Sequence, residues 1–526
     1  MRVLTDKWED GYLDYALLEQ QIRIKTAEWT VIDTVTGQFA EHKRSVRLLY
    51  NYWKAVGLKY VVMKVISRLK EANRNKKYIA FGYGEIIESR STDHKTGEFV
   101  YFMTTNSPQL LDYPVIDAPF VLKGAPILPK DFDTISFSIT TLPQNILTEI
   151  NDYKGYSAYS QNTINTPKLA GLLRKLIPFL EKSTPTATKY PHTNKYQIQL
   201  NTALPATTNS RKPTAVVLGW GQYAKVCLSP NIQKSINLIK IHEIDPLQLG
   251  NDLVGKNIAY DTQPNPNTDE NFDVYFAAGY HHTHTEIAVF ALERQKYAVV
   301  EKPLATTWQD YNTLKSHVAT TQKLFGCFHK RYSPFNKEVL RDFGIKKTGD
   351  TPICYYTTVF EVPLPELHWY NWSSACSRIV SNGCHWIDHF LWFNDYEPVT
   401  KMGLNVSTDL RDMVLFLEIA SGATFNMVLT DKGSPSIGVR DYIELRANGA
   451  TIKMTDSESY EYESAEGIKR HLRINKVRSY NDMYAIISEK INKGEQGDDP
   501  KMLYSTEIML RFEDLFLQEM NSRLNS

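Results

Sequence analysis

The sequence lacks several features that would each point to a particular class of protein. It has no run of about 18 consecutive apolar residues, so we expect no helix that spans a bilayer. Its N-terminus lacks the basic stretch, apolar stretch and small-residue cleavage site of a signal peptide. No repeat with a period of about 20–50 residues indicates a solenoid or propeller. Neither sign of charge is in excess, because 60 Lys and Arg face 59 Asp and Glu, which disfavours nucleic acid as the main partner.

Cysteine is scarce and unevenly distributed. The five cysteines all follow residue 226 and include no C-x-x-C pair, which favours reduced thiols in the cytoplasm. A catalytic zinc site needs about three protein ligands, so we expect none in the cysteine-free first 226 residues. The 526 residues are 42% hydrophobic and 23% charged, the balance of a soluble globular protein with about three domains.

The distribution of strand and helix signals predicts the fold class. A stretch rich in Thr, Pro and Asn at residues 183–213 is interpreted as a linker. Short apolar, β-branched runs follow it at residues 214–220, 238–245, 272–279 and 297–303. They alternate with helical signals, which favours a parallel Rossmann-like sheet. From about residue 354, strands separated by Ser421-Gly422 and Asn448-Gly449 predict antiparallel hairpins. The predicted class is therefore α/β, with a Rossmann-like parallel sheet followed by an α+β domain that has a mostly antiparallel open sheet.

A glycine-rich turn follows the first of these runs. Its residues are Gly219, Trp220, Gly221, Gln222, Tyr223 and Ala224. This G-x-G-x-x-A pattern permits a tight turn, close approach of a pyrophosphate and close packing of the helix that it opens. Asp245, with Glu243 as its competitor, ends the second run and is expected to bind the ribose hydroxyls. Because a carboxylate repels a 2′-phosphate, the predicted cofactor is NAD(P), with NAD favoured over NADP. The alternative is an α/β domain that binds no nucleotide.

Further motifs follow in order along the C-terminal portion. They are Tyr280-His281-His282-Thr283-His284, Glu301-Lys302-Pro303, Arg331-Tyr332, and Gly383-Cys384-His385-Trp386-Ile387-Asp388. In this order they resemble the Gfo/Idh/MocA oxidoreductases, over about residues 213–526. The resemblance implies an NAD(P)-binding Rossmann domain at 213–335 and a substrate and oligomerisation domain at 336–526.

The N-terminal portion carries a second resemblance. Residues 58–89 are similar to the basic helix and glycine-containing strand of a GroES-like domain, the catalytic domain of medium-chain alcohol dehydrogenases. The resemblance implies a mainly β GroES-like remnant at 1–150, then a helical segment and linker at 151–212. A second glycine fingerprint and the usual cysteine ligands are missing, so we interpret this part as a scaffold without zinc chemistry.

Three residues are the candidate catalytic groups. Lys302 follows a buried strand, and the resemblance implies that it contacts the nicotinamide ribose and a substrate oxygen. His385 and Asp388 are three apart and so share one helix face. Histidine titrates near neutral pH and suits the proton transfer that accompanies hydride transfer, with the carboxylate as its support. His281 and Glu301 are expected to contact the cofactor. The alternative for Lys302 is an ordinary surface lysine at the end of a strand, and the alternative for His385 is an ordinary histidine at a domain interface.

Two other patterns suggest a metal site and a contact with lipid or an acidic partner, and neither interpretation is favoured. The three neighbouring histidines at 281, 282 and 284 lack accompanying cysteines and do not share one helix face, so we expect cofactor or substrate contacts and no metal. Residues 41–77 are basic with an apolar stripe at helical spacing, which fits anionic lipid or an acidic partner but more often packs on its own domain.

The predicted function is an NAD(P)-dependent oxidoreductase that acts on a small polar alcohol or carbonyl, such as a sugar or sugar nucleotide. One alternative is a C=N reductase in natural-product biosynthesis, and another is a non-catalytic nucleotide-binding assembly protein. We expect a small-molecule substrate, no nucleic acid, no membrane span, and a homo-oligomer in the cytoplasm.

Overall fold

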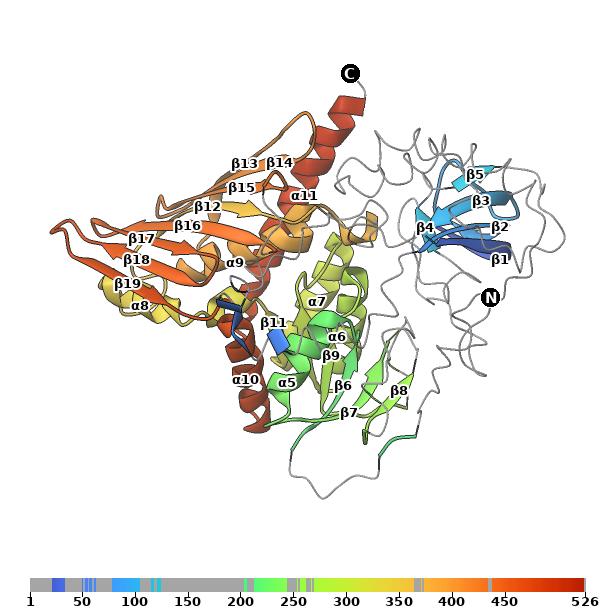
Figure 1. Ribbon diagram of the computed structural model, residues 1–526, viewed down its shortest axis with the longest axis horizontal. Helices are drawn as coiled ribbons and strands as arrows, with labels where there is room; N and C mark the ends of the chain where they lie inside the picture. Colours follow the sequence, from blue (N-terminus) through green and yellow to red (C-terminus); the bar gives the residue numbers. More distant parts are fainter. Residues whose placement is uncertain are drawn as a thin grey trace.

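The computed structural model describes most of the chain beyond residue 211 and parts of the N-terminal portion (Figure 1). The described residues are 21–33, 50, 53–54, 56–58, 61–62, 78–104, 115–117, 121–123, 203–205, 212–243, 253, 256–261, 266, 269–363, 370, 373–433 and 438–524. Most of the predicted linker, of the helical segment at 151–212 and of the basic stretch at 41–77 therefore lies outside them.

A six-stranded parallel sheet follows the predicted linker. Its order is β11-β10-β9-β6-β7-β8, and every neighbouring pair is parallel. The strands are β6 (Thr214–Leu218), β7 (Asn237–His242), β8 (Ala259–Asp261), β9 (Val274–Ala277), β10 (Tyr297–Glu301) and β11 (Leu324–Cys327). Helices α6 (His284–Glu293) and α7 (Trp308–Thr321) connect β9, β10 and β11. The Rossmann-like sheet expected from the four apolar runs is confirmed; β8, which is only three residues long, had no clear signal in the sequence.

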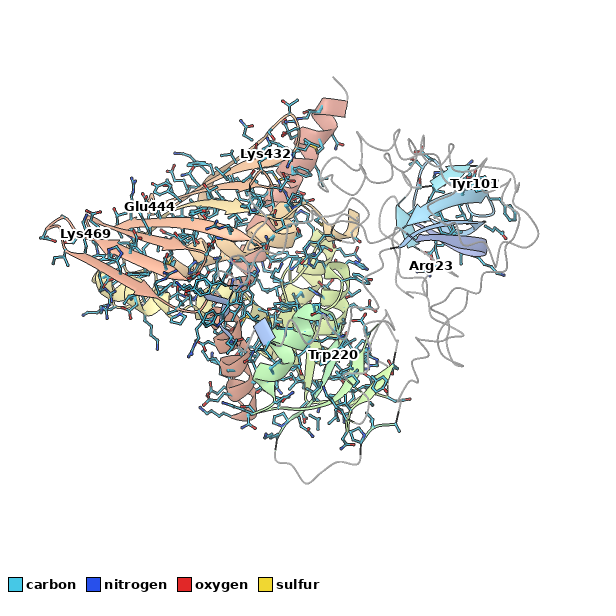
Figure 2. The ribbon with its side chains drawn as sticks, in the orientation of Figure 1. Arg23, Tyr101, Trp220, Lys432, Glu444 and Lys469 are labelled. Carbon is cyan, nitrogen blue, oxygen red and sulfur yellow. The ribbon has the colours of Figure 1, made fainter. Side chains whose placement is uncertain are left out.

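An eight-stranded sheet forms the second structural unit after the predicted linker, the parallel sheet being the first. Its order is β13-β14-β15-β12-β16-β17-β18-β19. The strands are β12 (Cys354–Phe360), β13 (Val399–Val406), β14 (Asp412–Ile419), β15 (Thr424–Thr430), β16 (Arg440–Ala447), β17 (Ala450–Thr455), β18 (Ser459–Glu463) and β19 (Lys469–Arg473). Six of its seven pairings are antiparallel, including the two predicted hairpins, and only β12 and β15 run parallel. Figure 2 locates Lys432, Glu444 and Lys469 along this sheet.

Alternation along the strands separates the two faces of this sheet. In β14, Met413, Leu415 and Leu417 are fully buried, while the residues between them are more exposed. The buried side chains pack with helices α9 (Cys384–Phe393) and α11 (Leu503–Leu524), which contribute Phe390 and Phe512 to the same core. One face is therefore covered by helices, as period-two alternation predicts.

Helix α10 (Arg478–Asn492) returns from the eight-stranded sheet to the parallel one. Its Met483, Tyr484 and Ile487 belong to the same hydrophobic core as Val217 and Phe276 of the parallel strands. Figure 1 shows α10 beside the short helix α5 (Ser229–Ile232), with which it is in contact. The parallel sheet is thus covered on this side by a segment from near the end of the chain.

The described N-terminal strands form a separate antiparallel sheet. They are β1 (Gln21–Asp33), β2 (Tyr78–Ser89), β3 (Phe99–Thr104), β4 (Val115–Asp117) and β5 (Val121–Lys123), in the order β4-β1-β2-β3-β5. Ile24, Ile86 and Phe102 are fully buried in it. The mainly β class is confirmed here, and the GroES-like resemblance stays a prediction. Within the described parts of the chain, no helix combines the length and apolar character needed to cross a bilayer.

Candidate active site

The two glycines of the fingerprint have different surroundings. Gly219 has a φ of +101°, and a Cβ placed on it would lie 2.4 Å from the backbone nitrogen of Gly279. Its N–H donates to the carbonyl of His242 (2.9 Å), so the turn is fixed between two strands. A Cβ on Gly221 would meet nothing within 4 Å. The turn is thus closed on the sheet side at Gly219 and open at Gly221, which fits the approach of a dinucleotide pyrophosphate.

The rest of the fingerprint leads into a short helical segment. After Gln222 and Tyr223, the π-helix η7 (Ala224–Leu228) is followed directly by α5. Ala224 is 1% exposed and packs in the core of the parallel sheet, where a larger side chain would not fit as closely. Tyr223 faces α10, and its hydroxyl lies 3.4 Å from that of Tyr484.

The acid that the structure describes beside the turn is Glu243, immediately after β7. Its carboxylate accepts a hydrogen bond from the backbone N–H of Trp220, which Figure 2 locates in the parallel-sheet unit. Asp245, the acid favoured from the sequence, lies outside the described residues. A carboxylate therefore does reach the glycine turn, and it belongs to the residue that was the weaker sequence candidate.

Lys302 connects the unit of the parallel sheet with the unit of the eight-stranded sheet. It follows β10, and its ammonium group donates to the carbonyl oxygen of Ser381 (2.6 Å) in the π-helix η12 (Ile379–Gly383), which leads into α9. Burial alone would lower the pKa of Lys302, but nearby Tyr370 and Cys384, with two glutamates, raise it overall. The Lys302 side chain therefore carries a positive charge where the two structural units meet.

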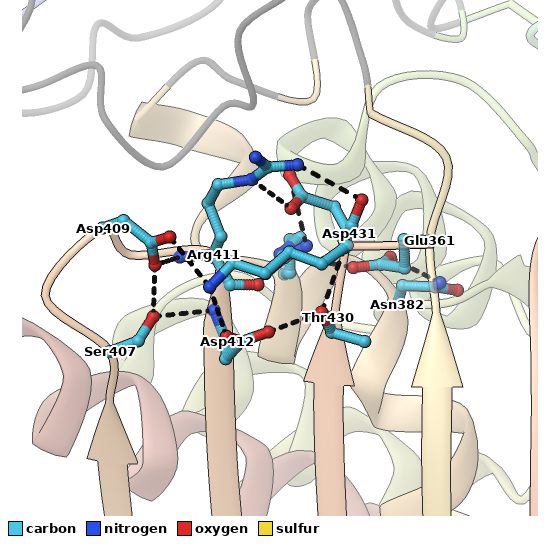
Figure 3. A network of polar contacts seen from close by, with 10 residues as sticks. Glu361, Asn382, Ser407, Asp409, Arg411, Asp412, Thr430 and Asp431 are labelled. Carbon is cyan, nitrogen blue, oxygen red and sulfur yellow. Dashed lines mark hydrogen bonds and ion pairs between the residues drawn. The ribbon is translucent and has the colours of Figure 1, made fainter. Parts of the chain in front are cut away.

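Those two glutamates hold neighbouring segments. Glu301, 8% exposed, accepts a hydrogen bond from the Tyr484 hydroxyl of α10, and burial raises its pKa. Glu361, which follows β12, accepts from the Asn382 amide (2.6 Å) and lies 3.4 Å from the Arg378 guanidinium. Figure 3 shows Glu361 and Asn382 at one end of a polar network that continues through Asp431 toward the neighbouring strands.

His385 lies in the first turn of α9 and is 5% exposed. Its ring meets that of His329 edge to face, with 4.2 Å between the ring centroids. Burial lowers the pKa of His385 well below its ordinary value, and the positive charges of Lys302 and Lys330 lower it further. The imidazole is therefore neutral at pH 7 and offers both a donor and an acceptor nitrogen.

Asp388 has a different partner from the one expected. It is fully buried, and its carboxylate accepts two hydrogen bonds from Arg331, one of them from Nε at 2.7 Å. Arg331 belongs to the 3-10 helix η9 (His329–Tyr332), so this pair joins η9 to α9. In the part of the chain that the structure describes, no hydrogen bond links Asp388 to His385. Tyr332, the other residue of the Arg331-Tyr332 motif, packs beside the core of the parallel sheet.

The three histidines after β9 surround the start of α6. His281 lies 4.8 Å from the Tyr370 ring, and the His284 ring donates to the carbonyl of Pro303 (2.8 Å). Burial lowers the pKa of His282 to about 3 and that of His284 to about 4. Among the described residues, no group of His, Cys, Asp and Glu gathers as metal ligands.

Three further residues of the site were missed from the sequence. His329 and Lys330 follow β11 at the carboxyl end of a parallel strand, a position that could have drawn attention to them. Lys330 forms a buried ion pair with Asp441 of β16. Tyr480 of α10 stacks on His329, and no local pattern marks it.

The parallel sheet and its glycine turn define a Rossmann-type domain, with Lys302 at the carboxyl end of β10. Residues 214–329 match the sequence profile of the Gfo/Idh/MocA family, an oxidoreductase family with an NAD-binding Rossmann fold. This segment is therefore a Gfo/Idh/MocA NAD-binding domain, and the resemblance inferred from the motifs is confirmed for it.

Several solved structures are similar to about three fifths of the chain. A dehydrogenase from Chromobacterium violaceum is 13% identical, covering 59% of this chain and 99% of its own, with a TM-score of 0.48. A Gfo/Idh/MocA family oxidoreductase from Vibrio cholerae is 11% identical, covering 60% and 100%, with a TM-score of 0.47. A levoglucosan dehydrogenase solved with NADH and levoglucosan is 14% identical, covering 58% and 96%, with a TM-score of 0.46. No curated protein sequence matches the chain significantly.

Proposed function

We propose that the protein is an NAD(P)-dependent oxidoreductase that transfers hydride between nicotinamide C4 and a carbon of a small polar alcohol or carbonyl, such as a sugar or sugar nucleotide. The observation that carries the proposal is the hydrogen bond from Lys302 to the Ser381 carbonyl (2.6 Å). It puts a cation at the carboxyl end of a parallel strand, where open α/β sheets bind ligands, and beside the segment that begins α9.

The cofactor half of the proposal rests on the glycine turn. Gly221 leaves room for a pyrophosphate, and Glu243 brings a carboxylate to the same turn. A carboxylate accepts hydrogen bonds from ribose hydroxyls and repels a 2′-phosphate, so we propose NAD as the preferred cofactor. When bound, the nicotinamide supplies or accepts the hydride. Tyr223, His281, Glu301 and the undescribed Asp245 remain proposed contacts of the cofactor.

The proton half of the proposal rests on Lys302 and His385. When hydride leaves an alcohol carbon, the hydroxyl must lose its proton, and a carbonyl that gains hydride must gain one. A neutral imidazole accepts that proton, and the nearby ammonium stabilises the negative charge that develops on the oxygen. Asp388 then acts at a distance, because its pairing with Arg331 holds α9 against η9.

Nicotinamide fluorescence with a panel of aldoses, cyclitols and sugar nucleotides tests this proposal. We expect turnover with at least one compound, and a loss of about 10²–10⁴-fold in kcat for His385→Gln. Lys302→Met should lower kcat/KM strongly, whereas Lys296→Met, which alters the half-buried ion pair with Asp273 at the opposite end of β10, should not. NADH binding without turnover of any compound would favour a non-catalytic nucleotide-binding protein instead.

We also propose that the protein self-associates through the outer face of the eight-stranded sheet. Val414 and Tyr442 are 43% and 47% exposed there. Light scattering should show an oligomer for the wild type and a smaller species for Tyr442→Lys, since a buried unpaired charge disfavours an interface. A monomeric wild type would contradict this part of the proposal.

A further inference from the structure

His385 is oriented without the hydrogen bond that usually fixes a proton-handling histidine. Such an imidazole commonly donates its second ring N–H to a carboxylate or carbonyl, which sets the tautomer and the ring plane. Here Nδ1 of His385 is buried and makes no hydrogen bond with the described residues. The nearby carboxylate of Asp388 is held by Arg331. Within the part of the chain that the structure describes, packing therefore sets the ring plane of His385.

The nearest ring that packs on His385 is that of His329. The two centroids are 4.2 Å apart at an interplanar angle of 76°, whereas Trp386 and Phe328 lie at 6.1 and 6.5 Å. His329 is itself 5% exposed, and its Nδ1 likewise makes no hydrogen bond with the described residues. The orientation of His329 therefore also depends on ring contacts.

Tyr480 supplies that contact from the other side. Its ring lies parallel to the His329 ring, with centroids 3.9 Å apart and an interplanar angle of 15°. It comes from α10, where Met483 and Ile487 are fully buried in the core of the parallel sheet. The amide of Asn231 also donates to the Asn481 side chain (3.0 Å), which fixes the first turn of α10. The stack thus starts from a firmly packed helix.

We propose that Tyr480 and His329 are positioning residues that hold the His385 imidazole. Tyr480 stacks on His329, which meets His385 edge to face, and we call these three rings the ring stack. The stack joins α10, η9 and α9, so a helix from near the end of the chain takes part in the active site. The inference rests on the proposed function only for the proton-handling role of His385. The ring contacts and their effect on the accessibility of His385 do not depend on it.

Carbethoxylation of the full-length protein tests the stack without cofactor or substrate. Diethyl pyrocarbonate modifies neutral imidazoles, and peptide mass spectrometry reports the rate at His385 separately from the other histidines. His471, whose side chain is 67% exposed on β19, serves as the internal reference. Tyr480→Leu removes the ring that clamps His329, while Tyr480→Phe keeps it and removes only the hydroxyl.

We expect Tyr480→Leu to raise the modification rate of His385 relative to His471 by about two- to tenfold, the range that an aromatic pair supports. Tyr480→Phe should match the wild type. Equal rates at His385 in all three proteins would overturn the proposal, whether or not the protein proves to be an oxidoreductase.

A second pair of variants examines His329 itself, and it decides the question if Tyr480→Leu fails to fold. His329→Phe preserves a ring of similar shape and should protect His385 as the wild type does. His329→Ala should expose His385 to the same degree as Tyr480→Leu. If His329→Phe exposed His385 as much as His329→Ala, a nitrogen of His329 rather than its ring would hold His385, and the ring stack would be refuted.

Discussion

Adding a side chain at the two fingerprint glycines should separate folding from cofactor binding. In Gly219→Ala the new Cβ would lie 2.4 Å from Gly279 N and 2.5 Å from the carbonyl of Ala278, which are backbone atoms directly after β9. The backbone would also have to keep a φ of +101°, which costs a residue with a side chain about 1–3 kcal/mol. Overpacking adds about 1–3 kcal/mol. We therefore expect Gly219→Ala to lose about 2–6 kcal/mol of unfolding free energy.

A side chain at Gly221 should leave stability unchanged and affect cofactor binding instead. A Cβ there meets nothing within 4 Å, so Gly221→Val should change the unfolding free energy by no more than about 0.5 kcal/mol. Its side chain would, however, fill the space through which a pyrophosphate approaches the turn. We expect Gly221→Val to abolish NADH binding while it leaves the fold intact.

Two assays separate these outcomes. Urea unfolding followed by tryptophan fluorescence measures stability, and titration calorimetry with NADH measures binding. If Gly221→Val bound NADH as tightly as the wild type, the pyrophosphate would not lie at this turn. If Gly219→Ala were as stable as the wild type, the reasoning from backbone contacts would be wrong.

Three further predictions concern charge. Asp388→Asn should cost about 3–5 kcal/mol in urea unfolding because it leaves the buried Arg331 cation without its main partner, whereas Glu418→Gln, in an exposed ion pair, should cost less than about 1 kcal/mol. Five buried histidines (281, 284, 329, 385 and 389) and the half-buried His282 have lowered pKa values, so each takes up protons only on unfolding, and stability should fall as pH drops below about 6.5. Between pH 7.5 and 5.5 each contributes a loss of about 1.4 kcal/mol. Two groups offset this loss in part: His242, whose pKa is raised by hydrogen bonds with two carboxylates, and Glu513, whose pKa burial raises to about 7; unfolding free energy that rose toward pH 5.5 would refute this. Glu243→Ser should narrow the preference for NADH over NADPH by about tenfold or more in calorimetry, and an unchanged ratio would show that this acid does not set the preference.

Local patterns were enough to predict the parallel sheet and its glycine turn. A buried parallel strand is a short apolar run. Strands β6, β9 and β10 each lie within such a run, and β7 begins one residue before its run. The demand for glycine at position 219 is local in one respect, because the turn after β6 gives this residue a φ of +101°, whereas the backbone that a Cβ would meet belongs to the distant Ala278 and Gly279. The hairpin turn at Asn448-Gly449 belongs to the same class, since both residues have positive φ.

Contacts between distant segments could not be predicted in the same way. Pairing of Asp388 with Arg331 joins residues 57 positions apart, and the spacing of Asp388 from His385 suggested a nearer partner. The parallel pairing of β12 with β15 depends on the order of strands in the sheet, which no strand reveals alone. Tyr480 reaches the site only because α10 returns to the parallel sheet.

The return of α10 also has a consequence for how the protein is made. The face of the parallel sheet that receives Met483 and Ile487 is complete in sequence by residue 327, at the end of β11. A ribosome must then add more than 150 further residues before that face can be covered. During this interval apolar side chains of the nascent nucleotide-binding unit remain in water, which favours association with chaperones and with other nascent chains. The unit expressed without α10 would retain the same exposed surface permanently.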